Sequence, residues 1–553
     1  MRSASSSPAA AGAASRRLAH YQGLFFDEFV PDSAWIREQG LVRLPPLDET
    51  TVFIVRGEMH PHPKVHGLEA GSLGADFLLD GRRVAALRGL KPGPFQVRFT
   101  ASPAGTRTGG VLGVQLRGTG LTNILAWVGR VTAGWPLTGA LQRFRHQNKN
   151  RQFRLARIET EAGDAVFDFS NRHSPFSPEF ARRGVRLGFN LAGFLTADLG
   201  IGESARCMAR AADAAGIALA LIDLKLPCKN RRGDPAYVGR LQEDNPYPVN
   251  VVHLDPPASR DLEHHHPGFC RGKYNIAYWA WELPEFPDAW LPACDYFDEI
   301  WAPSEFSREA IAYKSPIPVL AMPHSMSFAA PAEPAAVLRA RFGLPAELFL
   351  FLTLFDLNSY AERKNPRAAL AAFRQSRLGG AGAALVIKVQ NAAANPHEFA
   401  ELEAAARELP GTILLTETLA REDIYALEAA CDCFVSLHRA EGFGLAVAEC
   451  MLLGKPVIST DWSATAEYVT AANGCPVRAP LVTLERNYGP YARGQVWADP
   501  DVAEAARWMR ELFADRALAA RLGEAAQATI IDRFAPAVIG ARYRRRLEAI
   551  AGW

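Results

Sequence analysis

The sequence predicts an α/β protein in which two tandem Rossmann-like domains follow a smaller β-rich region. From residue 348 onward, strongly apolar strand-like runs alternate with amphipathic helical runs, and a shorter series of the same kind begins at Val185. Strands this apolar, separated by helices, indicate parallel sheets that are covered on both faces. Short β-like runs between turn residues over 50–118 predict the β-rich region.

The β-rich region is expected to form a small β-sandwich with short helices over residues 41–180. Its β-like runs cover 50–59, 75–87, 95–101 and 111–118. The Asp80-Gly81 pair inside the second run is a hairpin signal, and 154–169 has the pattern of another hairpin. Residues 1–40, which begin with an Ala/Ser-rich stretch, are expected to be a disordered or extended tail.

Each Rossmann-like domain is predicted from its own series of elements. The first domain is expected over 181–335, with strands at 185–191, 218–224, 249–254 and 274–281 and a helix at 203–216. The second is expected over 336–535, with strands at 349–356, 384–390, 412–417, 433–438 and 456–460 and helices at 365–377, 397–408, 421–431 and 444–454. Apolar residues recur at helical spacing in these helices, so each has one face to bury against its sheet.

The composition is that of an ordinary globular protein, but charge is unevenly distributed. The chain has 553 residues, of which 48% are hydrophobic and 22% are charged, and its formal net charge is +2. Residues 81–158 contain fourteen Arg or Lys and no Asp or Glu, so the remainder carries about −12, the difference between +2 and +14. A chain of this length predicts more than one domain.

Cysteine usage and the lack of export signals predict a reducing, cytoplasmic setting. The eight cysteines are scattered without zinc-ligand spacing, and Cys431 and Cys433 are expected on opposite faces of one strand. The first 17 residues lack the apolar core of a secretory signal. No run of 18 apolar residues occurs, so no membrane-spanning helix is expected.

The segment HRAEGFGLAVAECMLLGKPVIST, residues 438–460, contains the clearest candidate site. Its loop follows a predicted strand, and ligands of open parallel sheets bind at the carboxyl ends of strands. Gly442 and Gly444 allow close backbone approach, and the helix beginning near Leu445 adds a positive dipole end that suits a diphosphate. Glu441 and Glu449 are then placed to accept hydrogen bonds from a sugar and from a ribose. The alternative is a loop carboxylate and a solvated helical glutamate.

This segment resembles the donor-binding region of retaining GT-B glycosyltransferases of family 4, in a branch typical of bacterial polysaccharide assembly. The matching residues are Glu441, Gly442, Phe443, Gly444, Glu449, Gly454, Pro456, Val457 and Glu467, and Leu445 is expected to bind the donor beside them. FDLNSYAERKNP resembles the family's phosphate-binding loop, in which Lys364 takes the position of the phosphate-binding lysine. Ser359 stands where most members have an arginine, so Arg363 or Lys388 would supply the second cation. The resemblance covers residues 185–550.

The resemblance also implies an acceptor side in the first Rossmann-like domain. Gly200, Gly202 and Glu203 belong to a glycine loop and helix start like those that hold acceptors, although a plain strand-to-helix turn is the alternative. His253 ends a strand where the family places a histidine near the reacting sugar, and a capped strand-end histidine is the alternative. Trp279, Trp281 and Glu282 are expected to line the acceptor cleft, or the two tryptophans to be core. The closing helix, 536–553, is expected to cross back onto this domain, as GT-B chains typically do.

The implied activity is retaining transfer of a sugar from a nucleoside diphosphate sugar to a glycan or lipid-linked acceptor, in cell-surface polysaccharide synthesis. Glu441, Lys364 and His253 are the expected catalytic residues, with front-face attack assisted by the departing phosphate and with no cofactor or metal. No nucleic-acid partner is expected. Three alternatives remain open: a catalytically inactive sugar- or nucleotide-binding protein, an epimerase and a phosphorylase.

The acid-free stretch 81–158 predicts a docking surface for an anionic membrane. It combines its fourteen basic residues with Trp127, Trp135 and short aliphatic runs, which suit a lipid headgroup layer. Docking there would place the enzyme, peripherally, near a lipid-linked acceptor. A buried core for the tryptophans, a solvated basic face and a patch for an anionic polysaccharide or for the acidic remainder of the chain are the alternatives.

Overall fold

The structure, a computed structural model, describes most of the chain from Tyr21 to Ala551. The described ranges are 21–27, 30–44, 47–59, 74–103, 110–117, 153–163, 165–168, 188–228, 230–270 and 273–551. The expected helical stretches of the β-rich region, including Trp127 and Trp135, lie outside these ranges.

The N-terminal region forms one antiparallel sheet, with the strand order β5-β4-β7-β2-β8-β3-β6 and with β1 on β2 and β9 on β8. The strands are β1 (Tyr21–Asp27), β2 (Val30–Arg43), β3 (Thr51–Met59), β4 (Gly74–Leu79), β5 (Arg82–Leu87), β6 (Gly93–Ala101), β7 (Val111–Arg117), β8 (Phe153–Thr160) and β9 (Ala165–Asp168). The end strands β5 and β6 contact each other, so the sheet closes around one apolar core rather than forming a two-sheet sandwich. The sheet also begins at Tyr21, inside the expected tail, because β1 and β2 pair as a hairpin.

Part of the positive charge of residues 81–158 is neutralised inside this sheet. Asp76, which is nearly buried, pairs with Arg88 and with Arg117 at 2.7 Å. Arg157 pairs with Glu159 at 3.0 Å, just beyond the acid-free stretch. Acidic residues that flank the stretch therefore balance some of its arginines. This agrees with the alternative in which the basic stretch faces acidic residues of the same chain.

The first Rossmann domain contains a six-stranded parallel sheet in the order β11-β10-β12-β13-β14-β15. Its strands are β10 (Gly188–Gly193), β11 (Ala218–Asp223), β12 (Val249–His253), β13 (Tyr274–Tyr278), β14 (Glu299–Ala302) and β15 (Val319–Ala321). Its α-helices are α5 (Gly200–Ala214), α6 (Pro256–His265) and α7 (Glu305–Ala312). β11 and β12 lie on opposite sides of β10, so a topological switch point falls between β10 and β12.

The second Rossmann domain repeats this design in the order β18-β17-β16-β19-β20-β21. Its parallel strands are β16 (Phe349–Asp356), β17 (Ala383–Gln390), β18 (Thr412–Leu415), β19 (Cys433–Ser436), β20 (Val457–Thr460) and β21 (Cys475–Val477), and a hairpin is formed by β22 (Leu481–Thr483) and β23 (Val496–Ala498). Its α-helices are α8 (Ala335–Arg341), α9 (Ala361–Lys364), α10 (Pro366–Ser376), α11 (Pro396–Arg407), α12 (Arg421–Ala430), α13 (Leu445–Leu452), α14 (Val502–Ala514) and α15 (Arg516–Phe534). Its switch point lies between β16 and β19.

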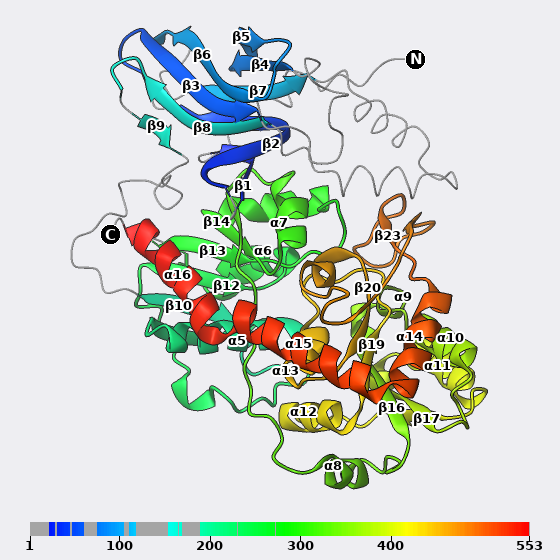
Figure 1. The fold of residues 1–553 in the computed structure, drawn as a ribbon. Helices are drawn as coiled ribbons and strands as arrows, with labels where there is room; N and C mark the ends of the chain where they lie inside the picture. Colours follow the sequence, from blue (N-terminus) through cyan, green and yellow to red (C-terminus); the bar gives the residue numbers. More distant parts are fainter. Residues whose placement is uncertain are drawn as a thin grey trace.

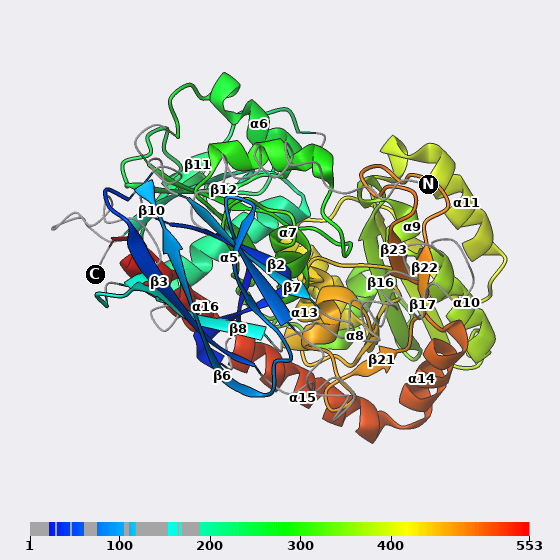
Figure 2. The same cartoon turned by 90° about the horizontal axis from the view of Figure 1, so that it is seen from above.

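The two Rossmann domains stand side by side, and the N-terminal sheet sits against the first, where β1 contacts α7 (Figures 1 and 2). The closing helix α16 (Pro536–Ala551) continues from α15 and returns to the first domain, as the sequence predicts. There Tyr543 stacks on Trp301 with ring centroids 5.3 Å apart. At Gly540 a Cβ atom would lie 2.1 Å from the Ala211 carbonyl oxygen, so only glycine allows α16 this close to α5.

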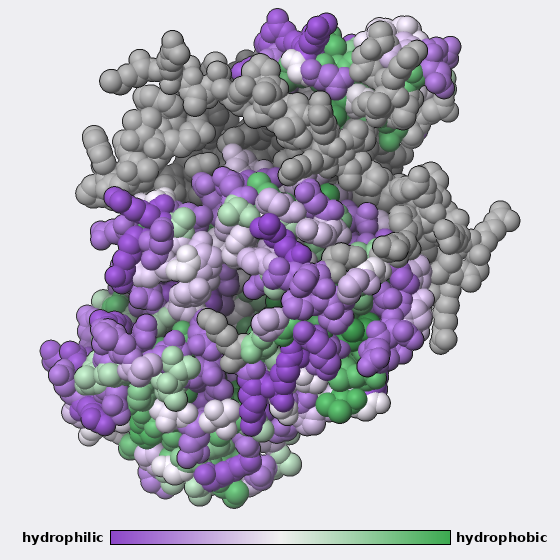
Figure 3. All heavy atoms as spheres, turned by 180° about the vertical axis from the view of Figure 1, so that it is seen from behind, coloured by the Kyte–Doolittle hydropathy of each residue, from purple (hydrophilic) through white to green (hydrophobic). Residues whose placement is uncertain are grey.

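The surface shown in Figure 3 is mainly hydrophilic over the described parts of the two Rossmann domains, with smaller hydrophobic areas between. Among the helices within the described ranges, none combines the length and the apolar character needed to cross a bilayer. All eight cysteines are free thiols, and six of them are buried.

Candidate active site

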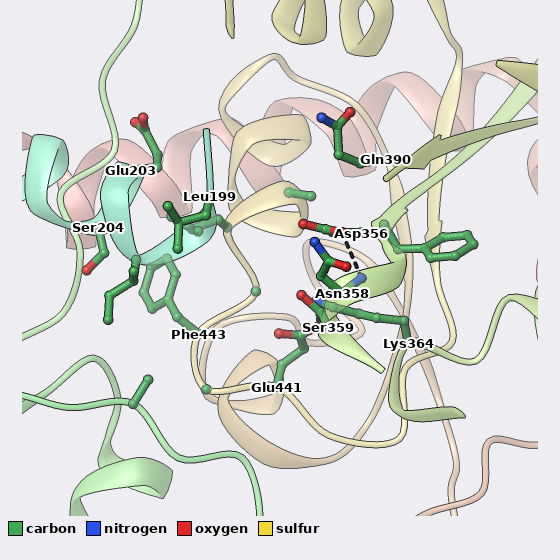
Figure 4. A pocket seen from close by; sticks show the side chains of 18 of the residues that line it. Leu199, Glu203, Ser204, Asp356, Asn358, Ser359, Lys364, Gln390, Glu441 and Phe443 are labelled. Carbon is green, nitrogen blue, oxygen red and sulfur yellow. Dashed lines mark hydrogen bonds and ion pairs between the residues drawn. The ribbon is translucent and has the colours of Figure 1, made fainter. Parts of the chain in front are cut away.

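A cavity of about 610 Å³ lies between the two Rossmann domains, at the carboxyl ends of both sheets. Its walls include the segments that follow β10 in the first domain and β16 and β19 in the second. These strands flank the two switch points, where the loops of an open parallel sheet diverge and leave room for a ligand. Figure 4 shows Leu199 and Ser204 on one side and Asp356, Asn358 and Lys364 on the other.

Lys364 and Glu441 form an ion pair at the centre of the second domain's wall. Lys364 ends the short helix α9 after β16, and Glu441 lies in the loop after β19. The Lys364 ammonium donates to Glu441 Oε1 at 2.5 Å, and Arg363 lies 3.4 Å from the other carboxylate oxygen. Burial alone would raise the pKa of Glu441, but Lys364 and Arg363 outweigh it and hold that pKa at about 2. Glu441 is therefore a carboxylate at neutral pH.

Arg363, which the sequence offers as a second phosphate cation, is engaged by the protein itself. Its guanidinium donates to the Ala440 carbonyl oxygen at 2.9 Å and lies 5.9 Å from the centre of the Tyr491 ring. Ser359 lines the cavity, and its carbonyl oxygen accepts from Arg363 at 3.4 Å. Arg363 therefore holds the two loops together and adds positive charge behind Glu441.

The glycine loop after β19 has the geometry that its sequence predicts. Gly442, Phe443, Gly444 and Leu445 line the cavity. Gly444 has a φ of +87°, and a Cβ atom there would lie 2.6 Å from the Thr465 side chain, so only glycine fits. The helix α13 begins at the next residue, which brings its unpaired N–H groups to this loop.

Glu449 lines the cavity from the first turns of α13 and is paired with Arg421, at the start of α12. Arg421 also lies 3.8 Å from Glu203, which belongs to α5 of the first domain. Glu203 is bound further by Arg206 at 2.8 Å and by Arg210 at 2.5 Å. Glu203 thus sits in a buried cluster of three arginines that joins the domains, so its carboxylate is committed to the protein.

Lys388 lies near the carboxyl end of β17 and is almost fully buried in the cavity wall. Its ammonium donates to the Gln390 side-chain oxygen at 3.2 Å. Burial lowers the pKa of Lys388 to about 8, against the opposing effect of Asp356. The second domain therefore presents two lysines to the cavity, and one of them titrates near physiological pH.

The first domain contributes only part of the expected acceptor set. Gly200, Trp281 and Glu282 line the cavity together with Glu203. Gly202 does not, and its role is packing, because a Cβ atom there would lie 2.6 Å from two carbonyl oxygens. Trp279 is also absent from the wall: its ring is fully buried between Phe286 and Phe297, so it belongs to the core.

His253 does not reach the cavity, and its expected contact with the reacting sugar is wrong for this structure. Side chains alternate along β12, so His253 points to the same face as Val251, which α5 covers. The imidazole is fully buried, with its ring stacked on Tyr278 at 4.2 Å and Nδ1 3.2 Å from the Ser204 hydroxyl.

His324 and Tyr491 are among the cavity residues that the sequence did not predict. His324, in the segment after β15, lines the cavity, and its ring meets that of Phe443 at 4.7 Å. Tyr491, in the connection between β22 and β23, reaches the first domain, where its hydroxyl lies 3.2 Å from Glu282 and its ring 5.4 Å from that of Trp281. A histidine that follows a strand and a tyrosine in a hairpin connection carry no local motif that would single them out.

The described residues contain no group of three or more His, Cys, Asp or Glu placed to hold a metal ion. Positive charge in the cavity wall comes from side chains instead, chiefly Lys364, Lys388, Arg206, Arg363 and Arg421.

Two facing Rossmann domains, a closing helix that returns to the first and a ligand cavity between them define the GT-B fold. Residues 353–529 match the family model described as glycosyl transferases group 1, which identifies the second Rossmann domain as a domain of that family. The proteins that this family model describes are glycosyltransferases. The matched residues include Lys364, Lys388, Glu441 and Glu449.

Solved structures of similar shape include HepE from Anabaena in complex with UDP and glucose, at 16% identity and a TM-score of 0.48, covering 64% of this chain and 98% of that one. A glycosyltransferase from Rickettsia africae is similar at 12% identity and a TM-score of 0.47, and the match covers 66% of this chain and 98% of that one. Sucrose-phosphate synthase from Thermosynechococcus elongatus is similar at 14% identity and a TM-score of 0.46, and the match covers 64% of this chain and 97% of that one. No curated protein matches the chain significantly. Because these TM-scores lie below 0.5, the assignment rests on the family match and the cleft geometry.

Proposed function

We propose that this chain is a retaining, metal-independent hexosyltransferase of glycosyltransferase family 4. It moves a sugar from a nucleoside diphosphate sugar to a glycan or lipid-linked acceptor in cell-surface polysaccharide synthesis. The observation that carries the proposal is the Lys364–Glu441 ion pair beside the glycine loop that opens α13, at a topological switch point. A cation, free backbone N–H groups and a carboxylate meet there, which matches a diphosphate next to a sugar.

The diphosphate would lie between Lys364 and the N-terminus of α13, with Lys388 on the adjacent strand. Backbone N–H groups and the helix dipole favour an anion at this position. Glu449, farther along α13, is placed for the ribose hydroxyls once Arg421 shares or releases it. Glu441 is left to accept hydrogen bonds from the sugar hydroxyls.

Cleavage of the bond between the anomeric carbon and the diphosphate oxygen leaves negative charge on that oxygen. Lys364 and the loop N–H groups would stabilise this charge, and such preorganised donors are usually the largest catalytic contribution. The acceptor hydroxyl would attack from the same face, and the departing phosphate oxygen would take its proton, which retains the anomeric configuration. Because the pKa of Glu441 is about 2, it remains a carboxylate and orients the sugar rather than donating a proton.

The acceptor would enter from the side formed by Trp281, Glu282 and Tyr491. The rings of Trp281 and Tyr491 are almost fully buried and shape this side of the cavity, and the partly exposed Glu282 carboxylate supplies a hydrogen-bond acceptor for a saccharide hydroxyl. Gly200 opens α5 at the same side.

The first experiment is a thermal-shift panel of UDP, GDP, ADP and their sugars with the full chain. A ligand at 100 times its Kd stabilises the folded protein by roughly 2.7 kcal/mol, which is easily measured. Transfer is then followed by NMR of the product anomer in the presence and absence of EDTA. Retained configuration and unchanged rate with EDTA support the proposal, whereas inversion or loss of activity contradicts it.

The same assays separate the alternatives. An inactive binding protein would bind a nucleotide sugar without releasing nucleoside diphosphate. An epimerase would change the sugar without an acceptor, and a phosphorylase would require inorganic phosphate.

Membrane docking through residues 81–158 stays a proposal of its own. Its support is the surplus of arginines that remains after Asp76, Glu159 and Glu161 have paired with some of them. Each basic residue near an anionic surface adds roughly 1 kcal/mol, and salt screens this attraction. The full chain should therefore co-sediment with anionic liposomes and less so as salt rises from about 50 to 500 mM. Equal binding to neutral liposomes, or none to anionic ones, would rule it out.

A further inference from the structure

His324 is held by a hydrogen-bond network that determines which of its nitrogens carries the proton. The hydroxyl of Tyr278 lies 2.8 Å from the Met322 carbonyl oxygen and 3.0 Å from His324 Nδ1. A carbonyl oxygen only accepts, so the single proton of Tyr278 is donated to Met322. Toward His324 the Tyr278 oxygen must therefore accept, and Nδ1 carries a hydrogen.

A second chain of contacts leads independently to the same result. His253 Nε2 lies 3.3 Å from the sulfur of Met208, which can only accept, so the His253 proton is on Nε2. His253 Nδ1 then accepts from the Ser204 hydroxyl at 3.2 Å. Since Ser204 has given its only proton, its oxygen accepts from His324 Nδ1 at 3.3 Å.

Because His324 is neutral, its other nitrogen carries a lone pair. Burial lowers the pKa of His324 to about 3, so only one ring nitrogen is protonated at neutral pH. Nε2 is therefore an acceptor, and among the described residues it has no hydrogen-bond partner. The residue lines the cavity between the domains, and its ring lies against Phe443 of the glycine loop.

We propose that His324 Nε2 accepts a hydrogen bond from a saccharide hydroxyl at the point where the donor sugar meets the acceptor. This inference rests on the proposed function and adds a residue to that site. A neutral nitrogen acceptor selects a hydroxyl over a carboxylate or a phosphate, neither of which has a proton to donate at neutral pH. The hydroxyl belongs either to the transferred sugar or to the acceptor. Removing the histidine nitrogen should weaken nucleotide-sugar binding in the first case and raise the acceptor KM in the second.

The functional test compares wild type with His324→Phe, which keeps a ring but removes the acceptor, and with His324→Gln, which restores an acceptor atom at similar reach. If the hydroxyl is on the donor sugar, His324→Phe weakens binding of the best nucleotide sugar of the panel about tenfold and leaves binding of its free nucleoside diphosphate unchanged. If it is on the acceptor, both affinities stay unchanged, the acceptor KM rises about tenfold and hydrolysis of the donor in water is unaffected. His324→Gln should recover part of either loss. His266→Phe, a histidine of the same domain that does not line the cavity, serves as the control.

Unchanged affinities and an unchanged acceptor KM in His324→Phe would overturn the inference. The second measurement needs no substrate: ¹⁵N NMR of labelled histidines should show the Nδ1-protonated tautomer for His324 at pH 7, assigned by its loss in His324→Gln. An Nε2-protonated imidazole there would also overturn the inference. A wild-type protein that binds no nucleotide sugar contradicts the proposed function instead, and the tautomer still decides the state of His324.

Discussion

The two Rossmann domains share one architecture but hold charge differently. In the first, the buried Glu299 accepts from Tyr274 at 3.0 Å, from Trp301 at 2.6 Å and from Arg546. In the second, the buried Glu428 has neither carboxyl oxygen hydrogen-bonded within the described part of the chain. The cavity shows the same contrast, with a neutral histidine network on one side and lysines on the other. Groups that change charge or partner are thus concentrated in the second Rossmann domain.

The largest expected effect tests this contrast through stability. Burial raises the pKa of Glu428 to about 8, against the pull of Arg421 and far above the value near 4.5 of the unfolded chain. The folded state then binds more protons than the unfolded state between these values, so the free energy of unfolding falls as pH rises from about 5 to 8, by a few kcal/mol at most. Glu428→Gln should remove this dependence in denaturant titrations. A wild-type curve that is flat over this range would break the comparison.

The next effect concerns the ion pair that faces the cavity. Lys364→Ala and Glu441→Gln should each lower transfer at least about tenfold, a loss of roughly 1.4 kcal/mol of transition-state stabilisation. Both variants should fold, since Arg363 still neutralises Glu441 in Lys364→Ala and glutamine keeps the size of the side chain in Glu441→Gln. The measurement is kcat/KM with the nucleotide sugar selected by the binding panel. Wild-type transfer by a folded Glu441→Gln protein would show that the site is assigned wrongly.

A smaller effect, on the binding of a nucleoside diphosphate at different pH values, tests the lysines of the second Rossmann domain. Because the pKa of Lys388 is about 8, its charge is lost as pH rises from 7 to 9, and nucleoside diphosphate binding should weaken by up to about tenfold. Lys388→Arg keeps its charge over this range and should flatten the profile, while Lys388→Met should bind weakly and without this pH dependence. Calorimetry at three pH values measures all three proteins. If Lys388→Arg shows the same pH dependence of binding as the wild type, a group other than Lys388 is responsible for it.

The smallest effect belongs to the acceptor side. Tyr491→Phe removes the hydroxyl that bonds Glu282 but keeps the ring beside Trp281 and Arg363. The acceptor KM should rise a few-fold, as for a lost hydrogen bond of about 1 kcal/mol, with the Kd of the nucleoside diphosphate unchanged. Tyr488→Phe, in the same hairpin connection, is the matched control. Equal changes in both variants would indicate a general loosening of the hairpin.

Sequence patterns predicted the cavity residues of the second Rossmann domain better than those of the first, for physical reasons. Gly444 and the helix behind it form a local motif, because one short segment must supply both the positive φ and the helix N-terminus. The partners of Glu441 follow another strand, so Lys364 was expected at the site only through the resemblance to a family, and its pairing with Glu441 was not predicted. Both parallel sheets were predicted from their apolar strands.

The remaining errors arise where long-range packing decides. His253 and Trp279 were expected at the site from the family resemblance. His253 instead lies under α5, and Trp279 packs between Phe286 and Phe297, so both belong to the core. His324 and Tyr491 join the site only after the two domains meet. The N-terminal sheet also depends on pairing that the sequence did not predict, since β1 and most of β2 lie within residues 1–40, which were expected to be a tail.

The return of α16 to the first Rossmann domain has a consequence for the order of synthesis. Glu299 leaves the ribosome about 250 residues before Arg546, yet Arg546 is a main partner of this fully buried carboxylate. An unpaired buried charge is strongly destabilising, so the first domain cannot reach its final packing while the second is still being made. Its α5 face also stays uncovered until Gly540 docks there. A nascent chain of this kind exposes apolar surface until α16 has been synthesised, and chaperone dependence during expression should reflect that interval.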